Sequence, residues 1–177
     1  KYLKRLLIFG IISWFSYSFY SYGDLLPIRM NPFIIHTGGI IFNLFLCLLL
    51  IYILDKKNYS IIINVLITLL VFYISLFFDW GGYCVLLTLI FYYFRGNKVL
   101  KWILYSIVCL IYGFYIFIDP IKFSISTGSN IYALGCLLVI PIIELLYNGE
   151  SGIKNNFNKY FFYIYYPLHL IIIRILV

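Results

Sequence analysis

Charged residues are scarce in this chain. They make up only 11% of the 177 residues, whereas hydrophobic residues make up 64%. Soluble domains are about 45–50% apolar and about 25% charged, so this composition excludes an ordinary soluble domain. Polar residues occur only as short breaks between apolar stretches, which leaves no room for an extramembrane domain. We therefore expect a single integral-membrane domain over residues 1–177, in contact with a lipid bilayer.

Cysteine motifs and long basic runs are also lacking. The four cysteines form no CxxC motif, and each lies inside an apolar stretch, so we expect neither a metal site nor a disulfide framework. No basic run exceeds two residues, and the net charge of +7 comes from positions at the ends of apolar stretches. This pattern is typical of membrane anchoring and indicates no nucleic-acid partner.

Seven apolar segments predict an all-α fold, a polytopic bundle of transmembrane helices. A helix needs about 20 residues to cross a hydrocarbon core of about 30 Å, and most of the segments approach that length. The fourth segment is short, so either its helix is short or the Asp79-Trp80-Gly81-Gly82 turn dips into the membrane. The segments are residues 6–22, 38–54, 60–78, 81–94, 99–118, 130–147 and 160–177.

Basic residues assign an orientation to these segments. With the amino end of the chain in the cytoplasm and alternating crossings, ten of the 13 Lys and Arg residues fall on the inner side. Such an asymmetry is the positive-inside pattern of bacterial plasma-membrane proteins, and one missed or extra span would scramble it. The three outer basic residues are Arg29, Lys122 and Arg174.

One histidine lies inside the last apolar segment. His169 is ten residues beyond Lys159, roughly 15 Å into the membrane if the segment is helical. Ionisable groups at this depth are rare and often functional, and Pro167 nearby removes a backbone donor and is expected to kink the helix. A neutral imidazole there is a candidate general base. The alternative is a structural histidine bonded to a neighbouring helix.

Asp79 is the candidate partner of this histidine. If its turn dips into the membrane, the carboxylate approaches the depth of His169, and an aspartate that orients a histidine is a common catalytic pair. The alternative is a solvated loop residue that caps the next helix.

Several inner residues are candidates to hold an anionic cofactor, because lysine binds phosphate as a point charge. The alternatives are membrane anchoring for the cations and an ordinary turn for Asn148-Gly149. Glu144 lies inside the sixth segment, where Lys154 or Lys159 is its expected partner. The candidate cofactor-binding residues are Lys4, Arg5, Asn148, Lys154 and Lys159.

Several motifs, in order and with matching spacing over nearly the whole chain, resemble the TraX family of bacterial membrane proteins. No single motif is specific, but the ordered set is. Among the family's pattern positions, Asp79, Tyr166, Pro167 and His169 match, whereas Ser151 stands where the family often has a basic residue. The matching motifs are residues 1–9, Asn43-Leu44-Phe45, residues 79–87, residues 146–152, residues 159–163 and residues 166–170.

The resemblance implies an inner-membrane acyltransferase. The family's named member acetylates the amino terminus of conjugative pilin, and the wider clan takes acetyl groups from coenzyme A for sugars and polysaccharides. It also implies an Asp-His motif and a Gly-Arg-x-Ala-Phe-Pro motif before Lys1, so we expect this chain to be the C-terminal part of a longer protein.

Two function classes remain beside the acyltransferase. In the first hypothesis, acetyl-CoA is a cosubstrate, His169 is the base, Asp79 orients it, and a pilin or surface glycan is the acceptor. Intramembrane His, Asp and Glu side chains also mark proton paths, so a small proton-coupled transporter is an alternative. A non-catalytic membrane assembly subunit, in which these residues lock helices together, is the other.

Overall fold

The protein is described by a computed structural model that covers residues 2–23, 39–56, 59–114, 116–119, 124–127, 131–147 and 155–176. These residues divide into two compact units. The first comprises Lys1–Gly81 and Ile153–Val177, and the second comprises Gly82–Gly152. Each unit is described by itself.

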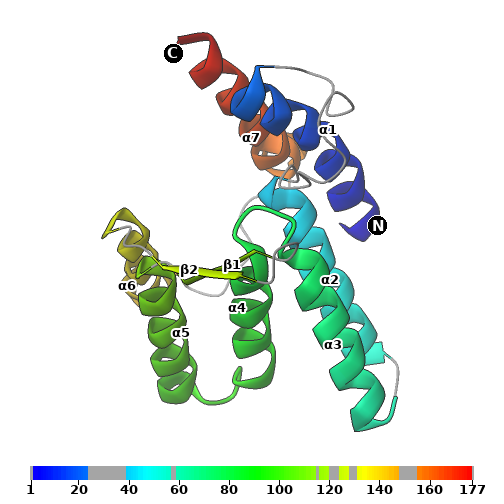
Figure 1. The fold of residues 1–177 in the computed structure, drawn as a ribbon, viewed down its shortest axis with the longest axis vertical. Coiled ribbons are helices and arrows are strands. Elements are labelled where there is room, and N and C mark those ends of the chain that lie inside the picture. The colour runs from blue at the N-terminus through cyan, green and yellow to red at the C-terminus, as the bar shows by residue number, and fades with distance from the viewer. Residues whose placement is uncertain are drawn as a thin grey trace. The chain divides into compact units, whose positions relative to one another are not determined.

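Four helices form the first unit: α1 (Tyr2–Tyr22), α2 (Ile40–Lys56), α3 (Ile61–Ser75) and α7 (Asn156–Leu176). In Figure 1, α1 lies beside α7, and α2 and α3 form a hairpin. The ring of Phe9 stacks on Tyr163 at 4.7 Å, and at the other end of α1 a Cβ at Gly23 would lie 3.0 Å from Arg174. The first and last helices therefore run parallel.

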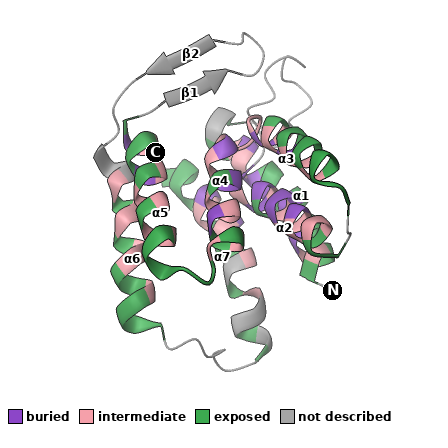
Figure 2. Cartoon of the chain, turned by 90° about the horizontal axis from the view of Figure 1, so that it is seen from below, coloured by how far each residue is buried: buried purple, intermediate pink, exposed green. Residues whose placement is uncertain are grey.

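Close backbone approach joins α1 to α2. A Cβ at Gly10 would lie only 3.2 Å from the ring of Phe42, so glycine lets the two helices meet there. Phe42 in turn stacks on Phe78 at 4.8 Å, just beyond the end of α3. The core of this unit is buried side chains of α1, α2 and α3, among them Leu6, Leu46, Leu50 and Val71 (Figure 2).

The second unit contains α4 (Gly81–Tyr93), α5 (Lys98–Gly113), strands β1 (Ile116–Asp119) and β2 (Ser124–Thr127), the 3₁₀ helix η2 (Ile131–Leu138), α6 (Val139–Pro141) and the π helix η3 (Ile142–Leu146). The strands pair antiparallel, with Ile116 opposite Thr127. The Asn97 side chain caps α5 by accepting a 3.1 Å hydrogen bond from the backbone N–H of Leu100. The Tyr105 hydroxyl donates to the carbonyl of Cys136 at 2.8 Å, which ties α5 to η2.

All seven apolar segments contain helix, so the mainly helical architecture is confirmed. Two details of the all-α prediction are wrong. The fifth segment does not stay helical to residue 118, because α5 ends at Gly113 and the β-branched and aromatic residues that follow form β1. The sixth is not one regular helix: it passes from 3₁₀ to α to π geometry around Pro141, whose ring removes a backbone donor.

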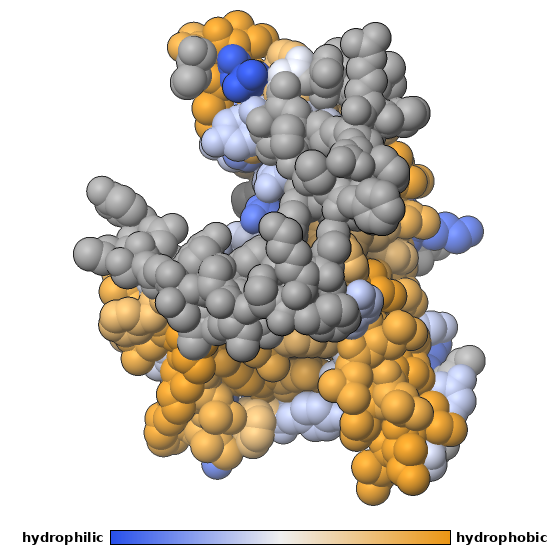
Figure 3. Space-filling model, in the orientation of Figure 1, coloured by the Kyte–Doolittle hydropathy of each residue, from blue (hydrophilic) through white to orange (hydrophobic). Residues whose placement is uncertain are grey.

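Large apolar side chains are exposed on several helices, most of all on α3. Ile61 is 82% exposed and Ile62 is 72% exposed, and Leu66, Leu69 and Leu70 continue the same apolar surface. Figure 3 shows this surface as a continuous orange area over α3. Within the described ranges, no helix meets both the length and the hydropathy that a bilayer crossing requires.

Candidate functional site

A strained turn joins α3 to α4 and carries Asp79. Trp80 has a φ of 67° and Gly81 has a φ of 47°, so two successive residues lie in the left-handed region. A bulky residue such as tryptophan is rarely found there, and its backbone is less stable by about 1–2 kcal/mol. Strain of this kind persists only where surrounding contacts impose it, and it concentrates at functional sites.

Asn43 on α2 supplies those contacts. Its side-chain NH₂ donates to the carbonyls of Asp79 at 2.9 Å and of Gly81 at 3.1 Å. Ser75 lies with its hydroxyl 2.8 Å from Asn43 Oδ1 and 2.6 Å from the Gly81 carbonyl, and its one hydrogen is shared between these acceptors. Both side chains are fully buried, so the turn is tied to α2 by bonds that water does not replace.

The Asp79 carboxyl group is partly buried in this turn. Its Oδ1 accepts a 3.0 Å hydrogen bond from the backbone N–H of Trp80. Burial raises the pKa of Asp79 above its ordinary value, and the bond from Trp80 opposes that shift without cancelling it. The group is therefore a carboxyl whose charged form is disfavoured by its surroundings, as is common at catalytic sites.

The Tyr166 hydroxyl on α7 lies at the start of α2 and is affected by the charge of Asp79. Its hydroxyl oxygen lies 3.1 Å from the position that a Cβ would occupy at Gly39, and it accepts a hydrogen bond from the backbone N–H of Ile40. The charge of Asp79 acts on this hydroxyl, and so does the hydroxyl of Tyr17 on α1. Groups from α1 and α2, together with Asp79, therefore act on this one phenol of α7.

His169 lies one turn further along α7. Its Nδ1 is 3.1 Å from the carbonyl oxygen of Tyr165, and its ring stacks on Tyr165 at 5.2 Å and meets Tyr166 edge-on at 5.4 Å. A carbonyl oxygen can only accept, so the proton of the neutral ring sits on Nδ1 in this bond. Nε2 then keeps a free lone pair, which is the arrangement that a general base requires. α7 remains one helix through Pro167.

His169 contacts Tyr166, and the charge of Asp79 acts on the Tyr166 hydroxyl. In the described part of the chain, Asp79 is bonded to Trp80 and His169 to Tyr165. The direct pairing of Asp79 with His169 remains a prediction.

Only two of the predicted phosphate-binding side chains lie in the part of the chain that the structure describes. Lys4 is exposed near the start of α1, and the Arg5 guanidinium lies 5.1 Å from the ring centroid of Tyr2. Asn148 and Lys154 lie outside the described residues, as does the side chain of Lys159. Only Lys4 and Arg5 can therefore be placed, both at the amino end of α1.

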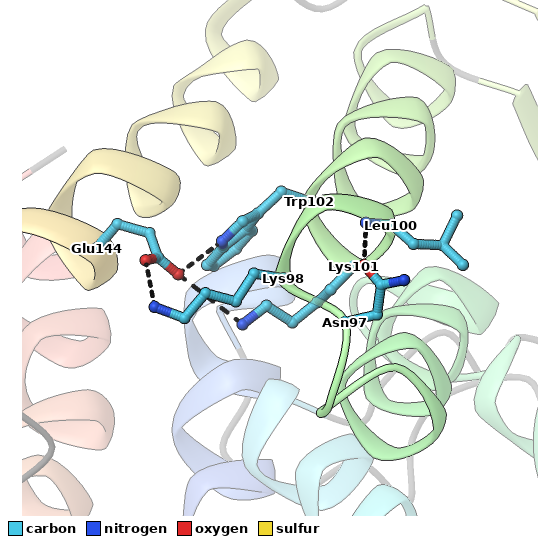
Figure 4. A network of polar contacts seen from close by, with 6 residues as sticks. All are labelled: Asn97, Lys98, Leu100, Lys101, Trp102 and Glu144. Atoms are coloured by element: carbon cyan, nitrogen blue, oxygen red, sulfur yellow. Dashed lines mark hydrogen bonds and ion pairs between the residues drawn. The ribbon is translucent and has the colours of Figure 1, made fainter.

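Glu144 has partners on α5 that the sequence did not predict. It pairs with Lys98 at 3.2 Å and with Lys101 at 4.0 Å, and it accepts a 2.7 Å hydrogen bond from Trp102 Nε1 (Figure 4). The expected pairing with Lys154 or Lys159 involves side chains outside the described residues and stays a prediction. Figure 4 shows that α5 presents all three partners toward η3, so the first turn of α5 fixes the π helix after Pro141.

Sequence reasoning missed Asn43 and Ser75 and gave Tyr166 no role. Asn43 carries a recognisable signal, because a lone amide inside the apolar run Ile40–Lys56 must be bonded if it is buried. Ser75 carries none, since serine is common in apolar helices. The importance of Tyr166 depends on contacts with Gly39 and Asp79, which are distant in sequence.

Comparison with known proteins defines the class of this chain. The family model described as "TraX protein" matches residues 1–177, the whole length. The chain belongs to the TraX family, as the resemblance of its motifs indicated.

The chain is also similar to one curated protein. The chain is 27% identical over 171 residues to the "Probable fimbrial assembly protein FimC, serogroup H1" of Dichelobacter nodosus, which covers 96% of this chain and 68% of that protein. No solved structure matches the chain.

Proposed function

We propose that this chain is part of a membrane acyltransferase that moves an acetyl group from acetyl-CoA to an amine or hydroxyl of a pilin-like protein or a cell-surface acceptor. The observation that carries the proposal is the hydrogen bond from His169 Nδ1 to the Tyr165 carbonyl, which leaves Nε2 free to accept a proton. Membership of the TraX family and the name of the Dichelobacter nodosus relative support the class of acceptor.

The proposed location is the bacterial plasma membrane, with the amino end of the chain in the cytoplasm. The exposed apolar side chains of α3 support it, because a face of this composition is stable against lipid tails and unstable against water. The excess of basic residues on one side of the expected segments supports the orientation.

The reaction needs one base and no covalent intermediate on the protein. The acceptor amine or hydroxyl attacks the thioester carbonyl carbon, its proton passes to His169 Nε2, and the carbon–sulfur bond breaks. The proton then goes to the coenzyme A thiolate, which leaves as a thiol. Asp79 favours the protonated imidazole through its charge, and Lys4 and Arg5 are the described cations available to attract donor phosphates.

The proposal is tested with membranes that contain the chain and radiolabelled acetyl-CoA. We expect label in a protein or glycan acceptor with the wild-type chain and no label with His169→Ala. Leu168→Ala is the matched control, since this neighbour on α7 is 51% exposed and should leave labelling unchanged. Absence of label with the wild-type chain, or normal label with His169→Ala, would contradict the proposal.

A second candidate is a non-catalytic subunit of fimbrial assembly. The name of the relative and the exposed apolar face of α3 favour it, because such a face also suits a partner helix. Loss of surface fimbriae after deletion, with full function in His169→Ala, would identify this role. Proton-coupled uptake by reconstituted vesicles, without acetyl transfer, would identify a transporter instead.

A further inference from the structure

We infer that the Tyr166 hydroxyl is a further catalytic group, which donates a hydrogen bond to the oxygen of the acyl carbonyl as negative charge develops there. The inference rests on the proposed acetyl transfer. It adds an oxyanion donor to the site in which His169 is the proposed base. It follows from the position of the phenol between the start of α2, the Asp79 turn and His169.

The surroundings of Tyr166 fix the direction of its hydroxyl. The Ile40 N–H donates to the phenol oxygen, and Ile40 is the first residue of α2, where backbone N–H groups have no partner inside the helix. An oxygen that already accepts one bond keeps its own hydrogen for another acceptor. The partial positive charge at the start of α2 makes that hydrogen a better donor.

The distance to His169 suits two groups that act on one substrate. The rings of Tyr166 and His169 are 5.4 Å apart between centroids and lie at 64° to each other. A carbonyl group near both rings can present its oxygen to the phenol while the attacking amine gives its proton to Nε2. The two roles of base and oxyanion donor then fall on neighbouring residues of α7.

Gly39 keeps this hydroxyl in place. A Cβ at residue 39 would lie 3.1 Å from the phenol oxygen and 3.4 Å from the ring, so any larger residue must displace Tyr166 by a few tenths of an ångström. Glycine therefore provides the space that lets the phenol reach the start of α2.

The step balances with these groups alone. As the acceptor nitrogen bonds to the carbonyl carbon, the carbon–oxygen double bond opens and its electron pair moves to the oxygen, where the Tyr166 O–H holds it. The double bond then re-forms and the carbon–sulfur bond breaks, which releases the thiolate. Tyr166 keeps its proton throughout, and His169 carries the acceptor's proton to the thiolate.

The test is the acetyl-transfer rate of the full chain with Tyr166→Phe, which retains the ring and removes only the hydroxyl. Loss of one oxyanion donor lowers kcat by about 10²–10³-fold. An interaction made only in the transition state lowers kcat and kcat/KM equally, so we expect an unchanged KM for acetyl-CoA. Tyr20→Phe is the control: it removes the hydroxyl of a tyrosine on α1 that is 40% exposed, and kcat should stay within about threefold of the wild-type value.

A kcat of Tyr166→Phe equal to that of the wild-type chain would overturn the inference, and so would an increased KM with unchanged kcat. If Tyr166→Phe fails to fold, Gly39→Ala takes its place, with an expected loss of kcat on the order of tenfold, because small misplacements of a catalytic group slow the reaction. Normal kcat in Gly39→Ala would then overturn it. Activity lost in His169→Ala but kept in Tyr166→Phe would reject this inference alone, whereas no transfer by the wild-type chain would reject the acyltransferase itself.

Discussion

The hydroxyl of Ser75 lies 2.8 Å from the side-chain oxygen of Asn43, and this contact joins α3 to α2 beside the Asp79 turn. It orients the Asn43 amide so that its NH₂ faces the carbonyls of Asp79 and Gly81. The opposite amide orientation would place its oxygen against two carbonyl oxygens. One buried pair therefore fixes the backbone that carries the candidate carboxyl group.

Asn43→Ala should destabilise the first unit, because the Asp79 carbonyl loses its donor and the Gly81 carbonyl keeps only the Ser75 hydroxyl. A buried polar group left without a partner lowers stability by about 1–3 kcal/mol, so we expect a loss of that size in the free energy of unfolding. Denaturation of the protein in detergent measures it.

Asn64→Ala is the matched control for Asn43. Asn64 also lies in an apolar helix, but its side-chain oxygen has no hydrogen-bond partner among the described residues. We expect a smaller loss of stability in this variant. Equal losses in the two variants would show that the bonds of Asn43 contribute little.

Gly81→Ala tests the strain of the turn. Gly81 has a φ of 47° and the nearest atoms to a Cβ are 3.9 Å away, so alanine fits but must adopt a left-handed backbone. We expect a loss of about 1–2 kcal/mol in the free energy of unfolding. Gly96→Ala is the control, because a Cβ there meets nothing within 4 Å and no positive φ is required. A stability of Gly81→Ala at or above that of Gly96→Ala would contradict the argument.

Asp79 should give the protein a distinct dependence of stability on pH. Burial raises the pKa of Asp79 in the folded state, so the folded chain holds this proton more tightly than the unfolded chain. The stabilisation is present below the ordinary pKa of aspartate, and the free energy of unfolding falls as the pH rises through the raised value. Unfolding measured across this range should show the decline in the wild-type protein.

Asp79→Asn should remove that decline and be more stable than the wild-type protein at neutral pH, since it keeps an acceptor for the Trp80 N–H and carries no charge. An identical slope of stability against pH in the variant and the wild-type protein would assign the dependence to other groups.

We expect the stabilities of two Glu144 variants to differ according to the interactions that each variant retains. Glu144→Gln retains an acceptor for Trp102 Nε1 and loses the charge, whereas Glu144→Ala loses both. Lys98 is 76% exposed, so its ion pair is screened and contributes little. We expect Glu144→Ala to lower the unfolding temperature more than Glu144→Gln does. Added salt should change the unfolding temperature of Glu144→Gln little. Equal shifts would show that charge, not the Trp102 bond, fixes η3.

The helices were predictable from the sequence because apolar composition and polar breaks determine them. Segment 81–94 corresponds to α4 within a residue at its end, since Gly81 and the Arg95-Gly96-Asn97 break mark the two boundaries. The hairpin β1–β2 and the irregular geometry around Pro141 were not predictable. Both depend on local backbone preferences, which cannot be read from a uniformly apolar composition.

The candidate site was predictable only in part. His169 and Asp79 are polar residues in apolar surroundings, so composition alone identifies them. The roles of Asn43 and Tyr166 depend on contacts between α2, the Asp79 turn and α7, which are separated by 36 residues and more in the chain. Hydropathy does not encode such contacts, and tyrosine is too frequent here for one of 19 to stand out.

Acetyl transfer by the purified chain in lipid vesicles tests the central claim most directly. The wild-type chain and His169→Ala are compared with radiolabelled acetyl-CoA and a pilin-like acceptor at saturating concentrations, with folding verified by thermal unfolding. We expect transfer by the wild-type chain and a rate at least about 10²-fold lower in His169→Ala, because a positioned base contributes about 10²–10⁴-fold. An equal rate in the two folded proteins would contradict the account.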